Sequence, residues 1–253
     1  MNGVVFLMLL ILAILLASKS KSSIEGFQEK GKYKYIFWTG GYDSTFCILK
    51  SLLVDNDSII PVYLSGNIDN KKLRFERHNK PEELQTMNKI RSIIHQQFPE
   101  KAFRLQPLLI LDDVKLSKDV NEAMKTMYYK YDIFTRPFNQ YGSMAQASLD
   151  LDAPIDLGYH WEDSEESSKL YKTFHKLVKN GKISTPWTGT YDIFKNFRFP
   201  IINSSKQDML EYAKVHNFDH ILYHTWSCWE PKNGKPCGKC NMCRERIIPN
   251  AIL

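Results

Sequence analysis

The stretch YKYIFWTGGYDSTFCILKSLLV, residues 33–54, decides the fold class of this chain. Its first part, Tyr33–Thr39, is rich in β-forming residues and ends at the pair Gly40–Gly41. Asp43 or Ser44 is then a typical helix N-cap, and apolar residues recur at helical spacing to the end of the stretch. The stretch therefore predicts a strand, a glycine turn and a helix in succession.

Further strands and helices alternate along the chain. The strand candidates are Ser58–Leu64, Phe103–Leu111 and Ala153–Gly158. The helix candidates are Pro81–Gln97, Asn121–Tyr129, Gln140–Leu149, Ser168–Val178 and Lys206–Val215. Strands that alternate with helices predict an α/β fold, a doubly wound parallel sheet with helices on both faces.

The composition is that of a globular protein. The chain has 253 residues, of which 43% are hydrophobic and 25% charged. These values exclude collagen-like, low-complexity and wholly disordered chains. A chain of this length buries a full core without covalent staples, so its cysteines are not needed to hold a small fold together.

The net charge of +6 comes from two segments. Residues 19–34 hold five Lys against two Glu, and residues 225–253 hold five Lys or Arg against two Glu, a surplus of three each. The intervening residues 35–224 therefore sum to zero. Because nucleic-acid-binding domains usually carry a basic face, no nucleic-acid partner is expected.

The first eighteen residues contain no charged side chain, and Gly3–Ala17 is a continuous apolar run. This run is close to the roughly 20 residues that a membrane-spanning helix needs. Lys19 and Lys21 follow it, and the positive-inside rule keeps the chain after such residues on the cytosolic side. We therefore expect an N-terminal hydrophobic helix that anchors a cytosol-facing domain to the membrane.

Two alternatives to the anchor remain open. The apolar run also has the length of a secretory signal, with Ser18-Lys19-Ser20 as a tolerable cleavage site, and cleavage would make the protein secreted or lumenal. A buried core helix is the other alternative.

The glycine turn is suited to binding an anion. Two adjacent glycines let the backbone turn sharply and let a ligand approach closely. The helix that follows presents free N–H groups and a positive dipole end, which favour phosphate. Thr39, Ser44 and Thr45 add hydroxyl groups, and Asp43 could hold a metal ion that bridges phosphates. A tight turn with an N-cap and no ligand is the alternative.

The motif TGGYDST, residues 39–45, resembles the SGGxDS loop of the PP-loop ATP pyrophosphatase superfamily, with Thr39 in place of the first serine. The resemblance implies a doubly wound fold that binds ATP with Mg²⁺ and cleaves it between the α- and β-phosphates. It also implies that Asp43 and Ser44 act in catalysis. The ATP-binding segment that it implies consists of Trp38, Thr39, Gly40, Gly41, Tyr42, Asp43, Ser44, Thr45, Phe46, Cys47 and Ile48.

Four of the five cysteines form the pattern Cys228-x8-Cys237-x2-Cys240-x2-Cys243. Four thiolates at such spacing predict a closed, structural Zn²⁺ site. An iron–sulfur cluster and disulfides are the alternatives. Zinc thiolates need a reducing compartment, which agrees with a cytosolic domain. The fifth cysteine, Cys47, lies on an apolar helix face and is interpreted as a small buried hydrophobic residue.

The glycine turn together with TWSC…CGKCNMCRER near the end resembles the 7-cyano-7-deazaguanine synthase family, and the resemblance extends roughly from Tyr33 to Arg246. The family's S-G-Y-P-D-C-R run, which lies beside its substrate, is missing after Gly158. Shorter segments that resemble the family in the same order are Phe75–His78 with Glu82–Glu83, Arg136–Phe138 before Ser143–Ala145, Asp156–Gly158 with Asp163–Ser164, and Phe199–Ile201 with Lys206 and Asp208.

The resemblance implies an ATP-dependent ligase of queuosine biosynthesis. It would convert 7-carboxy-7-deazaguanine and ammonia to 7-cyano-7-deazaguanine (preQ0) through an adenylated carboxylate, with ATP, Mg²⁺ and Zn²⁺ as cofactors, and a homodimer is left open. Candidate substrate or phosphate contacts, each with an ordinary solvated role as its alternative, are Arg77, His78, Arg136, His160 and Asp163. Other functions that stay open are an amide-forming or tRNA-thiolating PP-loop enzyme, a paralogue for another carboxylate, and a membrane-tethered non-catalytic zinc module.

The expected domain organisation follows from these segments. Residues 1–18 form the anchor or signal and 19–32 a polar tether. Residues 33–224 form the ATP-binding domain, 225–246 the zinc-binding segment and 247–253 a C-terminal tail.

Overall fold

The computed structural model describes residues 32–66, 77–112, 114–132, 140–160, 172–183, 189–244 and 246. Lys34–Leu253 form one compact unit. Within the described ranges, no helix combines the length and apolar character that a membrane crossing requires. This finding contradicts the predicted membrane anchoring, and the apolar run at 1–18, on which that prediction rested, lies outside the described residues.

The described strands form one seven-stranded sheet in the order β3-β2-β1-β4-β7-β6-β5. From β3 to β7 all neighbouring strands are parallel, and β6 and β5 continue the sheet in antiparallel pairs. The predicted α/β class with a largely parallel sheet is confirmed. The strands are β1 (Lys34–Phe37), β2 (Ile59–Leu64), β3 (Leu109–Leu111), β4 (Ile155–Asp156), β5 (Val178–Lys179), β6 (Lys182–Ile183) and β7 (Phe197–Arg198).

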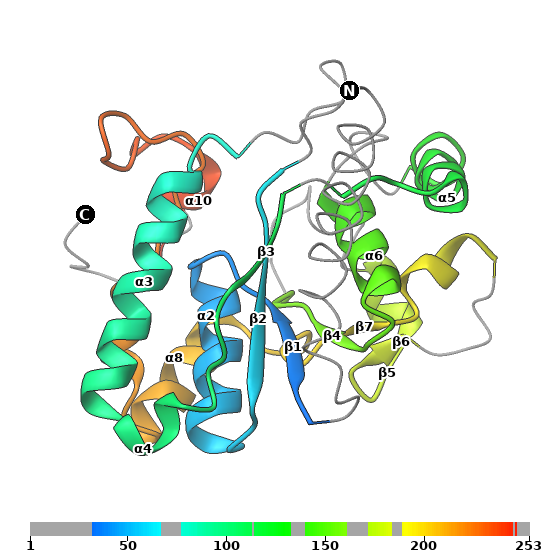
Figure 1. The fold of residues 1–253 in the computed structure, drawn as a ribbon. Coiled ribbons are helices and arrows are strands. Elements are labelled where there is room, and N and C mark those ends of the chain that lie inside the picture. Colours follow the sequence, from blue (N-terminus) through cyan, green and yellow to red (C-terminus); the bar gives the residue numbers. More distant parts are fainter. Residues whose placement is uncertain are drawn as a thin grey trace, which may run out of the picture. The chain divides into compact units, whose positions relative to one another are not determined.

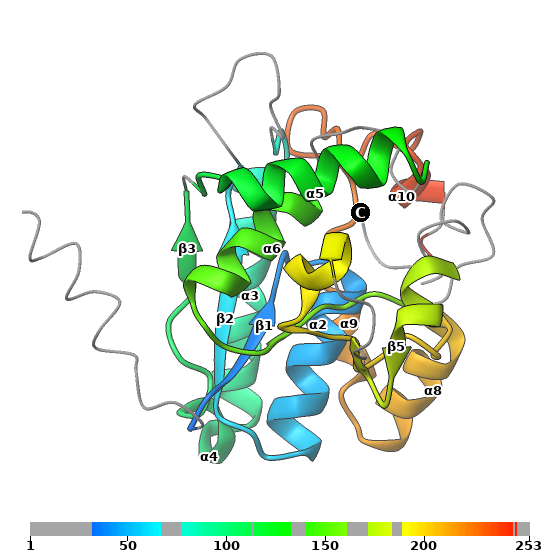
Figure 2. The same cartoon turned by 90° about the vertical axis from the view of Figure 1, so that its right-hand side faces the viewer.

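Helices cover both faces of this sheet (Figures 1 and 2). On one face lie α2 (Tyr42–Leu49), α3 (Lys80–Gln97) and α8 (Lys206–Val215), and on the other lie α5 (Lys118–Tyr129) and α6 (Gln140–Asp150). The shorter helical elements are the π-helix η1 (Lys50–Val54), α4 (Pro99–Ala102), the 3₁₀-helix η2 (Gly189–Phe194), α9 (Asp219–Leu222) and α10 (Asn241–Arg244). Residues 172–177 are also helical.

Some local predictions differ from the structure. The expected strand Phe103–Leu111 begins with a turn at residues 103–104, forms a single bridge from Leu105 to Ile59 and is a strand only from Leu109. Pro107 has no N–H to donate to a sheet, which explains the interruption. The N-cap of α2 is Gly41, in extended conformation, rather than Asp43 or Ser44, so both of those residues lie inside the first helical turn.

The core has two parts, one on each face of the sheet. Under α2 and α3, aliphatic side chains such as Ile36, Ile48 and Leu52 are fully buried together with Trp38. The opposite face carries a cluster of aromatic rings with centroids about 5 to 6 Å apart, which comprises Phe174, Phe194, Phe197, Phe199 and Tyr159. Alternation along β1 directs Ile36 to the first part and Phe37 to the second.

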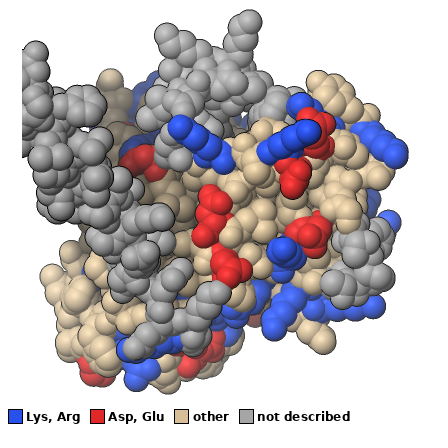
Figure 3. Space-filling view, turned by 45° about the vertical axis from the view of Figure 1, so that its right-hand side comes forward, with Lys and Arg blue, Asp and Glu red and all other residues tan. Residues whose placement is uncertain are grey.

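Charged side chains lie both on the surface and within the sheet. On the face shown in Figure 3, basic and acidic residues are interspersed. The buried carboxylate of Asp156 on β4 lies 3.3 Å from Lys34 Nζ on β1 and 3.8 Å from Arg198 Nε on β7. A buried carboxylate is stable only when it is paired, and these contacts tie the three central parallel strands together.

Candidate functional site

The glycine turn lies at the point where the strand order of the sheet reverses. Strand β1 has β2 on one side and β4 on the other, so the chain runs outward from β1 in both directions. In open α/β sheets, ligands bind outside the carboxyl ends of the strands at such a switch point. The turn at residues 38–41 follows β1, and the loop at residues 157–160 follows β4. The topology therefore brings two segments that are distant in sequence to one edge of the sheet.

Gly40 requires the absence of a side chain. Its φ is +72°, a left-handed conformation that L side chains rarely adopt. A Cβ at this position would lie 3.1 Å from the carbonyl oxygen of Glu83 and 3.2 Å from Thr86 Cγ2. The Gly40 carbonyl accepts a hydrogen bond from the main-chain N–H of Trp226 at 2.9 Å. The turn is thus enclosed by α3 and by the segment that leads into the cysteine cluster.

Hydroxyl groups of Thr39 and Ser44 face one another at the start of α2. Their oxygens lie 3.4 Å apart, and Ser44 Oγ also accepts a hydrogen bond from the Thr39 N–H at 3.3 Å. Thr39 Oγ1 in turn accepts from the Gly41 N–H at 3.4 Å. Both residues are half-buried, so these groups remain within reach of a ligand at the helix N-terminus.

The structure divides the predicted ATP-binding segment into a reachable part and a core part. The half-buried residues are Thr39, Gly41, Tyr42, Asp43 and Ser44. The buried residues are Trp38, Gly40, Thr45, Phe46, Cys47 and Ile48. Thr45 Oγ1 accepts a hydrogen bond from the Trp38 indole at 2.9 Å, so this hydroxyl braces the turn from inside. Cys47 packs in the core as predicted, and burial raises the pKa of its thiol.

His160 and Asp43 are brought together although they were predicted separately. His160 Nε2 lies 3.3 Å from Asp43 Oδ1, and the histidine is 4% exposed. Gly158 permits this approach, because a Cβ there would lie 2.9 Å from Ser44 N and 3.0 Å from Asp43 C. The loop after β4 therefore packs directly on the backbone of the α2 N-terminus.

The other candidate contacts fall in different environments. Arg77 is paired with Glu83 rather than directed by itself at the glycine turn, with Nη1 to Oε1 at 2.9 Å. His78 is exposed. Arg136 and Asp163 lie outside the described residues.

The sequence did not single out the buried Glu83 as the centre of a network. Its carboxylate, 5% exposed, accepts hydrogen bonds from Tyr63 Oη at 2.7 Å, Arg77 Nη1 at 2.9 Å and Asn79 Nδ2 at 3.1 Å. Burial raises the pKa of the Glu83 carboxyl, and these three partners lower it in part. Glu83 lies in the first turn of α3, where an acidic residue is common, so no sequence pattern indicated its burial, and Tyr63 and Arg77 come from outside the helix.

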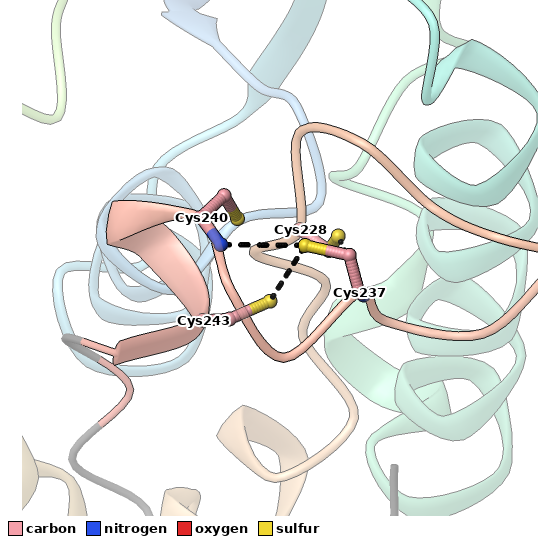
Figure 4. A group of neighbouring side chains, drawn as sticks. All are labelled: Cys228, Cys237, Cys240 and Cys243. Carbon is pink, nitrogen blue, oxygen red and sulfur yellow. Dashed lines mark hydrogen bonds between the residues drawn. The ribbon is translucent and has the colours of Figure 1, made fainter.

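The four cysteines of the C-terminal segment converge (Figure 4). Their Sγ atoms lie within 4.8 Å of one another, and Cys228 is buried while the other three are half-buried. Asn233 and Gly234 both have positive φ, so the chain reverses tightly between Lys232 and Lys235. This reversal returns the chain to Cys228, where the N–H of Cys237 donates to Cys228 Sγ at 3.2 Å.

The donor set fits a metal ion. Four sulfurs around zinc at about 2.3 Å would be about 3.8 Å apart, and the Sγ atoms of Cys237 and Cys243 are 4.0 Å apart. N–H groups of Lys239 and Cys240 lower the pKa of Cys237 to about 6, which favours its thiolate. Burial raises the pKa of Cys228 and Cys243, so their thiolates require a nearby cation. The cluster can therefore hold a metal ion.

Fold and site together define an α/β protein with a glycine turn at the switch point of its sheet and a four-cysteine cluster able to bind a metal. Residues 165–248 match the family model of "Queuosine biosynthesis protein QueC". A 47-residue stretch is 47% identical to the 7-cyano-7-deazaguanine synthase of Prochlorococcus marinus (strain MIT 9515), and it covers 19% of this chain and 20% of that protein. The predicted resemblance to this family is confirmed, and the chain matches about a fifth of its relative's length.

Proposed function

We propose that this protein is an ATP-dependent enzyme of the 7-cyano-7-deazaguanine synthase type. It would convert 7-carboxy-7-deazaguanine and ammonia to the nitrile preQ0. The observation that carries the proposal is the combination of the family match at residues 165–248 with the glycine turn at the switch point. A main-chain hydrogen bond joins these two regions, since the N–H of Trp226 donates to the carbonyl oxygen of Gly40.

The nucleotide would bind at the N-terminus of α2, as in the doubly wound PP-loop fold. Free N–H groups of the first helical turn and the hydroxyls of Thr39 and Ser44 would hold its phosphates. The left-handed Gly40 lets the turn pack closely against α3. Asp43 would hold the Mg²⁺ that accompanies ATP, and that ion would neutralise the charge that develops on pyrophosphate.

The chemistry follows from the poor reactivity of a carboxylate. A substrate carboxylate oxygen attacks the α-phosphorus of ATP, and pyrophosphate leaves with the electron pair of the broken P–O bond. Ammonia then attacks the acyl carbon, loses a proton and displaces AMP to give an amide. The amide oxygen attacks the α-phosphorus of a second ATP and a second pyrophosphate leaves, after which loss of AMP and two protons gives the nitrile. The part of this chain is to position the reactants and to stabilise the leaving pyrophosphate.

The cysteine cluster would hold Zn²⁺ in a closed, structural site. All four ligands come from the protein, which leaves no open position for substrate. Zinc supplies no reaction step there. It would fix the C-terminal segment against the glycine turn.

One structural observation counts against the tRNA-thiolating alternative. Such a reaction needs a cysteine that can carry a persulfide at the active site, and Cys47, the cysteine outside the cluster, is 2% exposed and packed in the core. The non-catalytic alternative and the paralogue for another carboxylate are separated by experiment.

Full-length, zinc-loaded protein should release pyrophosphate when it is given ATP, Mg²⁺, ammonium and 7-carboxy-7-deazaguanine. Mass spectrometry of the product should show the nitrile. Pyrophosphate release with a different deazapurine or purine carboxylate, but not with 7-carboxy-7-deazaguanine, would indicate the paralogue. If no carboxylate supports release, the proposed enzyme activity is wrong.

A further inference from the structure

Trp226 contacts the glycine turn through its main chain. Its N–H donates to the carbonyl oxygen of Gly40 at 2.9 Å. The carbonyl oxygen of Trp226 is also near the turn, because a Cβ on Gly41 would lie 3.6 Å from it. The position of the turn therefore depends on where the backbone of Trp226 is held.

The side chain of Trp226 is fixed by the cysteine cluster. Its indole Nε1 donates to the carbonyl oxygen of Cys228 at 2.8 Å. That same oxygen accepts from the buried amide of Asn79 at 2.9 Å. Cys228 is 1% exposed and is one of the four residues whose sulfurs converge. Two donors thus meet at the main chain of a single cysteine of the cluster.

Asn79 carries the same connection to the opposite side of the turn. Its amide also donates to the Glu83 carboxylate at 3.1 Å. The main-chain oxygen of Glu83 lies 3.1 Å from the place where a Cβ of Gly40 would be. The turn is therefore flanked by two residues, Trp226 and Glu83, that are both connected to the carbonyl of Cys228.

We propose that Trp226 is a positioning residue that makes nucleotide affinity at the glycine turn depend on the metal state of the cysteine cluster. This inference rests on the proposed nucleotide site. A metal ion that binds Cys228 Sγ orders the main chain of Cys228, and with it the acceptor for the Trp226 indole. Loss of the ion lets this acceptor move. Trp226 then shifts, and its main-chain hydrogen bond to Gly40 is weakened.

Coupling of this kind is reciprocal. If the bound metal raises the affinity for ATP by some factor, ATP raises the affinity for the metal by the same factor. Such factors commonly lie between about 5-fold and 150-fold. Zn²⁺ dissociation measured with and without ATP must therefore agree with ATP dissociation measured with and without Zn²⁺.

The test uses full-length protein and isothermal titration calorimetry with ATP. We expect removal of Zn²⁺ by a chelator to weaken ATP binding at least about 5-fold. Trp226→Phe keeps an aromatic ring but removes the indole N–H. In zinc-loaded protein it should weaken ATP binding between about 2-fold and 10-fold, the effect of one hydrogen bond, and it should also reduce the effect of zinc removal.

Trp229→Phe is the matched control. Trp229 is next to Cys228 in sequence and is 55% exposed, and it undergoes the same chemical change. It should leave both the ATP affinity and its zinc dependence unchanged. Equal effects of the two substitutions would overturn the proposal. So would an ATP affinity that changes neither with Trp226→Phe nor with removal of zinc.

Hydrogen exchange provides a measurement that needs no nucleotide. Removal of Zn²⁺ should speed exchange in peptides that cover residues 38–48 and 226, and Trp226→Phe should reproduce the change in zinc-loaded protein. Unchanged exchange at these residues overturns the coupling. If wild-type protein does not bind ATP but shows the expected exchange, the proposed function fails and the link between cluster and turn stands.

Discussion

Asp43 Oδ1 lies 3.3 Å from His160 Nε2, and the two residues come from the segments that follow neighbouring parallel strands. The imidazole is 4% exposed, so it stays beside the carboxylate without competition from bulk water. This contact fixes the direction of the acidic side chain that we expect at the phosphates.

His160→Leu should therefore lower kcat/KM for ATP between about 10-fold and 100-fold, because the Asp43 carboxylate would lose the neighbour that positions it. His160→Gln places an amide nitrogen near the position of Nε2 and should restore most of the loss. His95→Leu, on the exposed surface of α3, serves as the control. Equal activity of His160→Leu and His160→Gln would contradict a role in orienting Asp43.

Asp43→Ala should reduce pyrophosphate release by at least about 100-fold, because the charge that we expect to hold Mg²⁺ at the phosphates is lost. Its zinc content, measured by elemental analysis, should equal that of the wild type. Asp55→Ala removes a carboxylate that pairs on the surface with Lys50, and it should keep full activity. A fully active Asp43→Ala protein would show that the glycine turn is not the nucleotide site.

Gly158→Ala should destabilise the protein by about 1–3 kcal/mol, since the new methyl group would overlap the main chain of Asp43 and Ser44, which cannot move alone. Urea unfolding measures the change. Gly142→Ala in α6 is the comparison, because the new methyl group would meet the flexible side chains of Met124 and Leu116 and alanine favours a helix. It should cost clearly less, and equal losses would mean that the contact between Gly158 and α2 is loose.

The buried Glu83 gives a pH dependence with a defined sign. Burial raises the pKa of its carboxyl, so the folded protein holds this proton more tightly than the unfolded chain does. Its contribution to stability is therefore greatest below the unfolded pKa of about 4.3 and falls as pH rises through the folded-state pKa. Urea unfolding of wild type and Glu83→Gln between pH 4 and 7 should show the difference shifting in favour of Gln with rising pH. A constant difference would mean that the pKa is not raised.

Thiol reactivity should separate the cysteines into two groups. In zinc-loaded protein all of them should react slowly with a thiol reagent. A chelator should release the four thiols of the cluster to fast reaction, while Cys47, 2% exposed in the core, should react only after denaturant is added. Fast reaction of Cys47 in folded protein would contradict its packing under α2.

Local patterns predicted much of this fold. Helix α8 spans Lys206–Val215 as expected, because Ser205 and Asp208 form a capping box that marks its start in the sequence. The strand, turn and helix at residues 34–49 were predicted from the β-rich run, the glycine pair and the helical spacing of apolar residues, although the predicted N-cap was wrong. The spacing of the cysteines likewise indicated their convergence, since that geometry is set by short loops.

Contacts between distant segments were not predictable in the same way. His160 faces Asp43 because β4 is the neighbour of β1, and no local sequence pattern predicts the order of strands in a sheet. Strands β4 to β7 have two residues each, too few for an alternating pattern. The helix η1 was missed as a π-helix because its wider turns depend on tertiary packing rather than on residue type.

The bond between Trp226 and Gly40 also has a consequence for synthesis. During translation the glycine turn leaves the ribosome long before Trp226 is synthesised. The turn therefore lacks this hydrogen-bond donor through most of translation. A premature stop codon just before Trp226 would leave every described strand encoded. The truncated product would contain these strands, but its turn would lack the donor from Trp226.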